Sequence, residues 1–193
     1  RNPIILIVNK KLLFQQMKDL SYNFQVNKLN VKYINFDNLN NKKINFIDIP
    51  FNKEKVANYI DQSFEIALFL IKKNYKINLI NGPINKKKIL KQKFLGITEY
   101  LDFKTKSHGK AVMLIYNKKI SVSPLTTHLP LKKVHKHINK KKIINHVKII
   151  TEFYRRRFKI NPKIAITGLN PHCESNFNKS EEKEIIIPSI KYL

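Results

Sequence analysis

Two histidines that follow apolar stretches are the residues best placed for chemistry. His172 comes after residues 164–167 and the break at Gly168, and His128 comes after residues 120–123 and a loop that opens with proline. The β-branched residues of the first stretch predict a buried strand, and the alternation of apolar and polar residues in the second predicts another strand, each ending where its polar loop begins. Because open α/β sheets bind ligands beyond the carboxyl ends of their strands, we expect the two imidazoles to share one site.

The chemistry that two such imidazoles favour is metal ligation. Neutral imidazole binds borderline divalent ions, and a catalytic site uses about three protein ligands with one position open for water or substrate. Thr127 and Asn170 adjoin the histidines and are expected to orient the two rings. Cys173 is either a thiolate ligand or a small buried thiol, and the buried thiol is favoured. Spacing alone reveals no third ligand, so loop histidines that bind nothing are the simpler interpretation at this point.

A second candidate binding feature lies at residues 77–86. A predicted strand is stopped by Gly82 and a proline, and a helix is expected to begin near Lys86. Because helix N-termini attract anions, the backbone N–H groups and the Lys86 ammonium would suit a phosphate, whereas a plain surface turn is the alternative. Further along, Gly96 precedes a predicted helix that Thr98 is expected to cap.

The elements that must position these residues alternate between strand and helix, which predicts an α/β protein. We expect one α/β region over residues 1–193, since no internal repeat and no linker rich in Pro, Gly or Ser interrupts it. In the first predicted helix Gln16 is expected to face the interior, and Pro188 is expected to interrupt the last one. The predicted strands are 4–8, 31–34, 44–49, 77–80, 111–116, 119–123 and 164–167, and the predicted helices are 11–20, 53–73, 140–158 and a segment starting at Ser180.

Several well-known catalytic signatures are missing from the sequence. It contains no GxGxxG turn, no P-loop, no GxSxG elbow and no HExxH helix. Each of these would bring a phosphate, a nucleophile or a metal to a defined strand or helix end. The sequence therefore does not support chemistry by those routes.

The chain is strongly basic, with 38 Lys and Arg against 13 Asp and Glu and a net charge of +25. Such an excess raises nucleic acid as a partner. Phosphate-reading surfaces favour arginine, however, and almost all of these residues are lysine. Lysine, asparagine and isoleucine share A/T-rich codons, so we interpret the charge as compositional drift on a solvated surface. His135, His137 and His146 lie in a lysine-rich helical region and are expected on that surface.

A single cysteine excludes a disulfide framework within the chain and fits a reducing compartment. No apolar run approaches the roughly 20 residues of a membrane span, so no membrane partner is expected and the cytoplasm is the default location. The chain begins at Arg1 inside an apolar segment and ends inside another, so we expect it to be incomplete at both ends.

Several motifs together resemble the 4-hydroxythreonine-4-phosphate dehydrogenase family of pyridoxal phosphate biosynthesis. They are NGPINKKKI, FLGITEYL, MLIYNKKISVSPLTTHLPL, and ITGLNPHCES followed by EEKEIIIPSI. The similarity runs in order through most of residues 77–193, while residues 1–76 fit the family more loosely. The resemblance implies a three-layer α/β/α architecture of two subdomains, like that of isocitrate and isopropylmalate dehydrogenases, and a homodimer with the active site between subunits.

The resemblance also implies roles for individual residues. His128 and His172 match two of the family's three metal-binding histidines, and the third belongs to a later YHDQ-like segment outside this chain. Thr98 matches a substrate-contacting threonine, and Lys86 matches the lysine after the Gly-Pro turn, a tentative catalytic residue.

Two positions depart from the family pattern. Ile97 replaces a histidine that contacts substrate, and an isoleucine side chain cannot hydrogen-bond. The loop after His172 reads CES where the family commonly has AGE, which moves the acidic group to Glu174. Both changes affect the expected contacts with substrate.

The implied reaction is the NAD-dependent oxidation of 4-phosphooxy-L-threonine to 2-amino-3-oxo-4-phosphooxybutanoate, which decarboxylates to 3-amino-2-oxopropyl phosphate. The implied cofactors are NAD and a divalent metal such as zinc, magnesium or cobalt. Two alternatives stay open. One is a paralogous dehydrogenase for another phosphorylated four-carbon hydroxy acid, which Ile97 would allow, and the other is a basic nucleic-acid-binding module without enzymatic activity.

Overall fold

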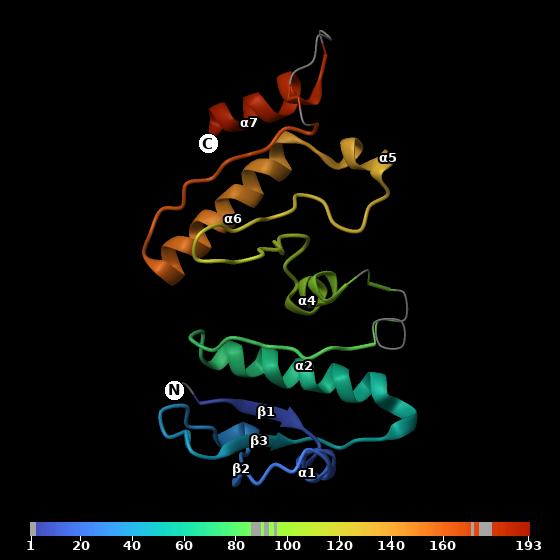
Figure 1. Ribbon diagram of the computed structural model, residues 1–193, viewed down its shortest axis with the longest axis vertical. Coiled ribbons are helices and arrows are strands. Elements are labelled where there is room, and N and C mark those ends of the chain that lie inside the picture. Colours follow the sequence, from blue (N-terminus) through green and yellow to red (C-terminus); the bar gives the residue numbers. More distant parts are fainter. Residues whose placement is uncertain (1–2, 86–89, 91–92, 95, 171, 174–178) are drawn as a thin grey trace. The chain divides into compact units, whose positions relative to one another are not determined.

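The computed structural model describes residues 3–85, 90, 93–94, 96–170, 172–173 and 179–193. Two compact units divide the chain, Arg1–Lys93 and Phe94–Leu193 (Figure 1). None of the helices in these described residues combines the length and apolar character needed to cross a bilayer.

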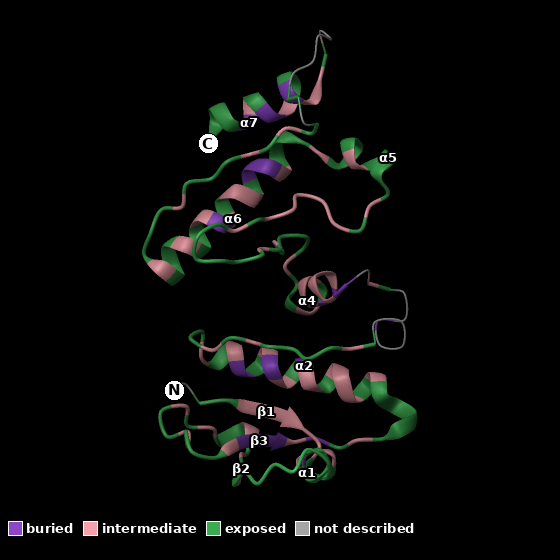
Figure 2. Ribbon diagram, viewed as in Figure 1, coloured by how far each residue is buried: buried purple, intermediate pink, exposed green. Residues whose placement is uncertain are grey.

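The first unit is built on a parallel sheet of three strands, β1 (Ile5–Val8), β2 (Val26–Lys28) and β3 (Ile44–Asp48), in the order β1-β3-β2. Parallel strands of one sheet need crossover connections, and α1 (Lys10–Asp19) lies in the connection from β1 to β2. The central strand β3, buried in Figure 2, contains Asn45 and Phe46, the most deeply buried of the described residues in this unit. This parallel sheet with its helices confirms the predicted α/β class.

The helix α2 (Val56–Lys73) follows a 3₁₀ turn, η2 (Lys53–Lys55), and packs on the sheet. Its buried residues recur at helical spacing and include Leu70, which joins Ile47 and Ile49 in one core cluster. The long predicted helix 53–73 is therefore confirmed. In α1, by contrast, Gln16 is exposed, so its predicted inward orientation is wrong and Leu13 is the buried residue of that helix.

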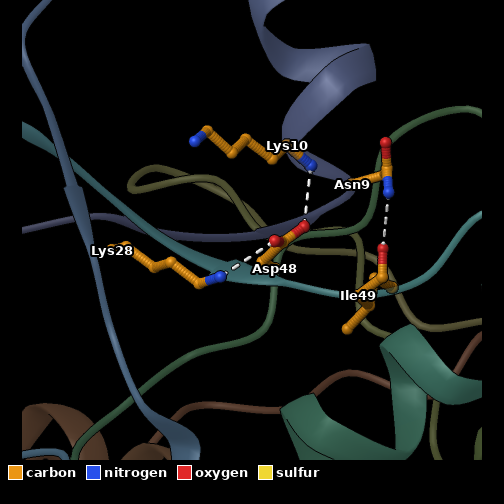
Figure 3. Close-up of polar contacts among 5 residues, drawn as sticks. All are labelled: Asn9, Lys10, Lys28, Asp48 and Ile49. Carbon is orange, nitrogen blue, oxygen red and sulfur yellow. Dashed lines mark hydrogen bonds and ion pairs between the residues drawn. The ribbon is translucent and has the colours of Figure 1, made fainter.

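Polar side chains lock the carboxyl ends of β1 and β3 (Figure 3). Asp48 accepts hydrogen bonds from the backbone N–H of Lys10 at 2.9 Å and from the Lys28 ammonium at 3.0 Å. The Asn9 side chain donates to the Ile49 carbonyl at 2.9 Å and also accepts from the first turn of α1. Donation from Lys10 N–H, and then from Lys28, lowers the pKa of Asp48 below its ordinary value. These contacts hold the carboxyl ends of β1 and β3 and the start of α1 in place.

The second unit contains helices and one isolated antiparallel bridge, Ile115↔Val122, with the rest of the described chain in irregular segments. The bridge lies within the predicted pair of strands 111–116 and 119–123, which is shorter than expected. The π-helix η4 runs directly into α7, and Pro188, the second residue of α7, lies in the first turn where proline is tolerated, so it does not interrupt the helical run. The helical elements are α4 (Ile97–Thr105), α5 (Leu131–Val134), η3 (His135–His137), α6 (Lys140–Phe158), η4 (Glu182–Ile186) and α7 (Ile187–Tyr192).

Three predicted strands are wrong. Residues 31–34 begin with a 3₁₀ turn, η1 (Val31–Tyr33), because the Asn30 side chain accepts from Lys32 N–H and starts a helical turn instead. Residues 77–80 and 164–167 are irregular. An apolar pattern indicates that a segment is buried but not that it pairs with another strand. Ile77 packs against the core cluster without belonging to a strand. Ile164 is not even buried, at 38% exposure.

Candidate active site

A cavity of about 700 Å³ lies in the second unit and is lined by residues from several parts of it. The first residues of α4 contribute Thr98 and Glu99, the loop after the bridge contributes Thr127, and α6 contributes Asn145 and His146. Of the residues predicted from sequence, the structure therefore brings together Thr98 and Thr127. Neither His128 nor His172, both of which the structure describes, lines this cavity.

Gly96 occupies the N-cap of α4, directly beside the loop that carries His128. A Cβ atom at Gly96 would lie 3.0 Å from Oε2 of Glu99 and 3.5 Å from Nε2 of His128. Its φ of −159° is extended backbone open to any residue, so the space and not the dihedral angle favours glycine here. The carboxylate and the imidazole thus face the same opening over the Gly96 Cα.

Thr98 sits in the first turn of α4, with Ile97 as the first residue of the helix and both side chains half-buried. The expected cap by Thr98 is wrong, because the N-cap is Gly96 and no side chain bonds the helix start there. Thr98 is one of the residues that line the cavity. Ile97 places an apolar group at the neighbouring position, where hydrogen bonding to a ligand is impossible.

His128 is exposed and has a φ of 55°, in the left-handed region that a non-glycine residue adopts only at some cost. The adjacent Thr127 donates its hydroxyl to Oε1 of Glu99 at 3.4 Å. Thr127 therefore contacts the carboxylate that faces the same opening as His128. Its predicted role of orienting an imidazole stays a prediction.

The loop that carries His172 is organised by the Asn170 side chain. Asn170 Oδ1 accepts from the backbone N–H of His172 at 2.9 Å and of Cys173 at 3.1 Å. At Gly168 a Cβ atom would overlap the Cys173 sulfur and lie 3.2 Å from its Cα, so glycine is required by close approach. Asn170 thus shapes the turn that presents His172. The Cys173 thiol is exposed, so the expectation of a buried thiol is wrong.

His146 is half-buried, which corrects its expected place on the surface. Its Nε2 lies 2.6 Å from the Ser123 hydroxyl, which donates its own proton to the Met113 carbonyl at 2.5 Å. Burial, and then the nearby Lys142 charge, lower the pKa of His146. The sequence did hold a signal, because position 146 stands three residues after buried Ile143 and four before buried Ile150.

Two further contacts hold the segment before the His128 loop against α6. The Tyr154 hydroxyl donates to Ser121 Oγ at 2.9 Å, and the Tyr116 ring stacks on Phe158 with centroids 5.2 Å apart. Together with Ser123 and His146, these contacts fix the chain just before the loop of Thr127 and His128. The loop therefore leaves a segment that α6 holds in place.

Two atoms next to Gly96, one on His128 and one on Glu99, are of the kinds that bind a cation. Oε2 of Glu99 is a buried carboxylate oxygen with no hydrogen-bond partner among the described residues, and it faces the same opening as the imidazole nitrogen. Imidazole and carboxylate are both ligands of divalent metals. Across the described ranges, no group of three or more His, Cys, Asp or Glu side chains is arranged to hold a metal. Lys86 and Glu174 lie outside the residues that the structure describes.

Solved structures share the fold of this chain. The 4-hydroxythreonine-4-phosphate dehydrogenase of Klebsiella pneumoniae superposes with a TM-score of 0.82 at 21% identity, covering 98% of this chain and 62% of that one. A putative 4-hydroxythreonine-4-phosphate dehydrogenase of Salmonella typhimurium gives a TM-score of 0.76 at 22% identity, covering 97% of this chain and 61% of that one. At these identities the likeness is one of fold, and it agrees with the predicted α/β architecture.

Curated relatives are similar over half of the chain. The 4-hydroxythreonine-4-phosphate dehydrogenase of Sulfurihydrogenibium sp. is 42% identical over 102 residues, which is 52% of this chain and 31% of that protein. The protein of the same name from Aquifex aeolicus is 37% identical over 100 residues, which is 51% of this chain and 31% of that protein. The match thus spans less than a third of the length of these relatives.

The family model described as pyridoxal phosphate biosynthetic protein PdxA matches residues 1–193. The match includes residues 1–76, where the motifs gave only a loose fit. It confirms the resemblance drawn from the sequence, and the chain belongs to the pyridoxal phosphate biosynthetic protein PdxA family.

Proposed function

We propose that the protein containing this chain is an NAD-dependent dehydrogenase that oxidises 4-phosphooxy-L-threonine in pyridoxal phosphate biosynthesis. The product, 2-amino-3-oxo-4-phosphooxybutanoate, then loses carbon dioxide to give 3-amino-2-oxopropyl phosphate. The observation that carries the proposal is the family match over residues 1–193, together with curated relatives that bear the dehydrogenase name. We further propose a cytoplasmic homodimer as the working form.

His128 and His172 are the proposed ligands of a divalent ion, whether zinc, magnesium or cobalt. When bound, such an ion supplies Lewis-acid chemistry to a substrate hydroxyl, and NAD supplies the hydride acceptor. Support for the His128 side comes from its Nε2 and the unpartnered Oε2 of Glu99, which both lie within 3.5 Å of the point where a Gly96 Cβ would stand. Asn170 supports the His172 side by holding its backbone in a tight turn.

Thr98, which lines the cavity, would orient the substrate. A hydroxyl there can donate to a carboxylate or phosphate oxygen of the substrate and accept from its amine. Lys86 is proposed to meet the phosphate or the reacting hydroxyl. Ile97 offers no polar atom where family members carry histidine, so the chain has one fewer contact for orienting the substrate.

Ile97 also favours a second candidate, a paralogous dehydrogenase for another phosphorylated four-carbon hydroxy acid. The two are separated by assaying the complete polypeptide with NAD and either 4-phosphooxy-L-threonine or 4-phospho-D-erythronate, following NADH absorbance. Turnover of the threonine derivative with the higher kcat/KM supports the first proposal. Preference for the erythronate supports the paralogue.

A matched pair of variants tests the assignment to the histidine site. His128→Ala is expected to abolish turnover, whereas His135→Ala, at an exposed position, is expected to leave it unchanged. A basic nucleic-acid-binding module would behave differently. It would show no dehydrogenase activity, and salt-sensitive binding to nucleic acid would persist in His128→Ala.

A further inference from the structure

The carboxylate of Glu99 is only half satisfied. Its Oε1 accepts from the Thr127 hydroxyl at 3.4 Å, whereas Oε2 is buried and has no hydrogen-bond partner within the described part of the chain. Removing a carboxylate oxygen from water without a partner is costly, so buried polar atoms of this kind are nearly always paired in working proteins. The unpaired oxygen therefore points to a partner that the protein acquires.

Secondary structure does not supply that partner. Glu99 is the third residue of α4, a position from which a glutamate commonly reaches back to the N–H of the N-cap residue. Oε2 makes no such bond to Gly96, although it lies close to that residue. A helix-capping role thus leaves this oxygen unexplained.

The nearest chemistry on the same side of Gly96 is the imidazole of His128. Both Oε2 of Glu99 and Nε2 of His128 lie within 3.5 Å of the point where a Gly96 Cβ would stand. The missing side chain leaves a small opening bordered by one negatively charged oxygen and one nitrogen donor. Neither Asp102 nor Lys104, the other charged residues of α4, has a side-chain atom within 4 Å of the point where a Gly96 Cβ would stand.

We propose that Glu99 is a positioning residue for the divalent cation at His128, an inference that rests on the proposed function. Its Oε2 faces the cation, and its negative charge raises the affinity of the site. Thr127 fixes the other carboxylate oxygen and so directs Oε2 toward the opening. Thr127 thereby acts on the cation through Glu99, in contrast to a direct bond to an imidazole.

The test is cobalt binding to the complete polypeptide, measured by titration calorimetry and by the visible absorption of the bound ion. Removing a carboxylate that supports a ligand typically weakens metal binding about 10- to 100-fold. We expect a loss in that range for Glu99→Gln, which keeps the side-chain size and removes the charge. Thr127→Val is expected to give a smaller loss. Glu184→Gln makes the same charge change at an exposed position of the same unit and is expected to change nothing.

The outcomes separate this inference from the proposed function. Cobalt binding that is lost in His128→Ala but unchanged in Glu99→Gln and Thr127→Val overturns the role of Glu99 and leaves the metal site standing. Absence of cobalt binding in the wild-type protein overturns both. A merely structural role for Glu99 predicts a lower Tm with unaltered cobalt affinity and spectrum, and Thr127→Val answers the same question should Glu99→Gln fail to fold.

Discussion

The Ser123 hydroxyl lies 2.6 Å from Nε2 of His146 and joins the segment before the His128 loop to α6. Because the hydroxyl gives its only proton to the Met113 carbonyl, its oxygen accepts the Nε2–H of a neutral imidazole. The ring is half-buried, and α6 carries Lys142 one turn away. The Nε2–H donor is present in both the neutral and the charged ring, so it is burial and the Lys142 charge, and not this hydrogen bond, that disfavour a protonated His146.

Stability is therefore expected to fall as the pH drops through the histidine range. Burial and Lys142 lower the pKa of His146 from its ordinary 6.5, so the unfolded chain takes up this proton first. The stabilisation is present above pH 6.5 and is lost as the pH falls toward the folded pKa. In urea unfolding across this pH range, His146→Gln should lose less free energy of unfolding than the wild-type protein, because glutamine keeps an N–H donor and does not titrate. An equal loss in both proteins would contradict the assignment.

Asp48 carries a second pH-dependent contribution with its own window. The backbone N–H of Lys10, followed by the Lys28 ammonium, lowers the pKa of Asp48 below 3.8, so the folded state holds the charged form. The stabilisation is present above pH 3.8 and disappears as the pH falls through the folded pKa. Asp48→Asn should therefore flatten the acid limb of a thermal unfolding profile.

The two donors to Asp48 are expected to contribute differently to the free energy of unfolding. Lys28 is largely exposed, with a side-chain exposure of 61%, so Lys28→Gln should cost less than about 1 kcal/mol and mainly at low salt. Lys32→Gln, a neighbouring exposed lysine, serves as the control. A loss from Lys28→Gln as large as that from Asp48→Asn would show that the ion pair, and not the Lys10 N–H bond, dominates.

Local sequence patterns predicted the elements whose burial follows a regular period. The strands at residues 5–8 and 44–48, α2 and α6 all appear near their expected places. The other elements depend on contacts with residues distant in sequence. Asn45 stands fully buried in the central strand because its side chain bonds the carbonyl of Asn40 and the side chain of Asn27, a pairing that no local pattern announces.

The candidate site was predictable in its residue types but not in its contacts. His128 was identified from the polar loop that follows an apolar run, and Thr98 from its place at a predicted helix start and its match to a family motif. A glutamate in the first turn of a helix ordinarily indicates no more than a favourable charge, and the approach of Glu99 to the His128 loop depends on how α4 meets that loop. His146 was missed because its partner, Ser123, lies 23 residues away in sequence.

Gly168 should tolerate no side chain while Cys173 keeps its position. Gly168→Ala would bring a Cβ into the Cys173 sulfur and within 3.2 Å of its Cα, so we expect a loss of about 2 kcal/mol, within the range for overpacked sites. Cys173→Gly in the same chain should restore part of it, because it removes the sulfur and suits a φ of 52°. Chemical unfolding of the single and double variants measures both effects. Failure of the second change to help would place the strain elsewhere.

Gly96→Ala is expected to damage the candidate site more than the fold. The backbone at Gly96 is extended and accepts alanine, but the new methyl would stand 3.0 Å from Oε2 of Glu99 and 3.5 Å from Nε2 of His128. The flexible carboxylate can swing aside, so Tm should fall only slightly, while cobalt affinity should drop about as far as in Glu99→Gln, about 10-fold or more. Gly82→Ala, with open space around the added atom, is the matched control. Normal cobalt binding by Gly96→Ala would mean that the opening between Glu99 and His128 is not where the cation sits.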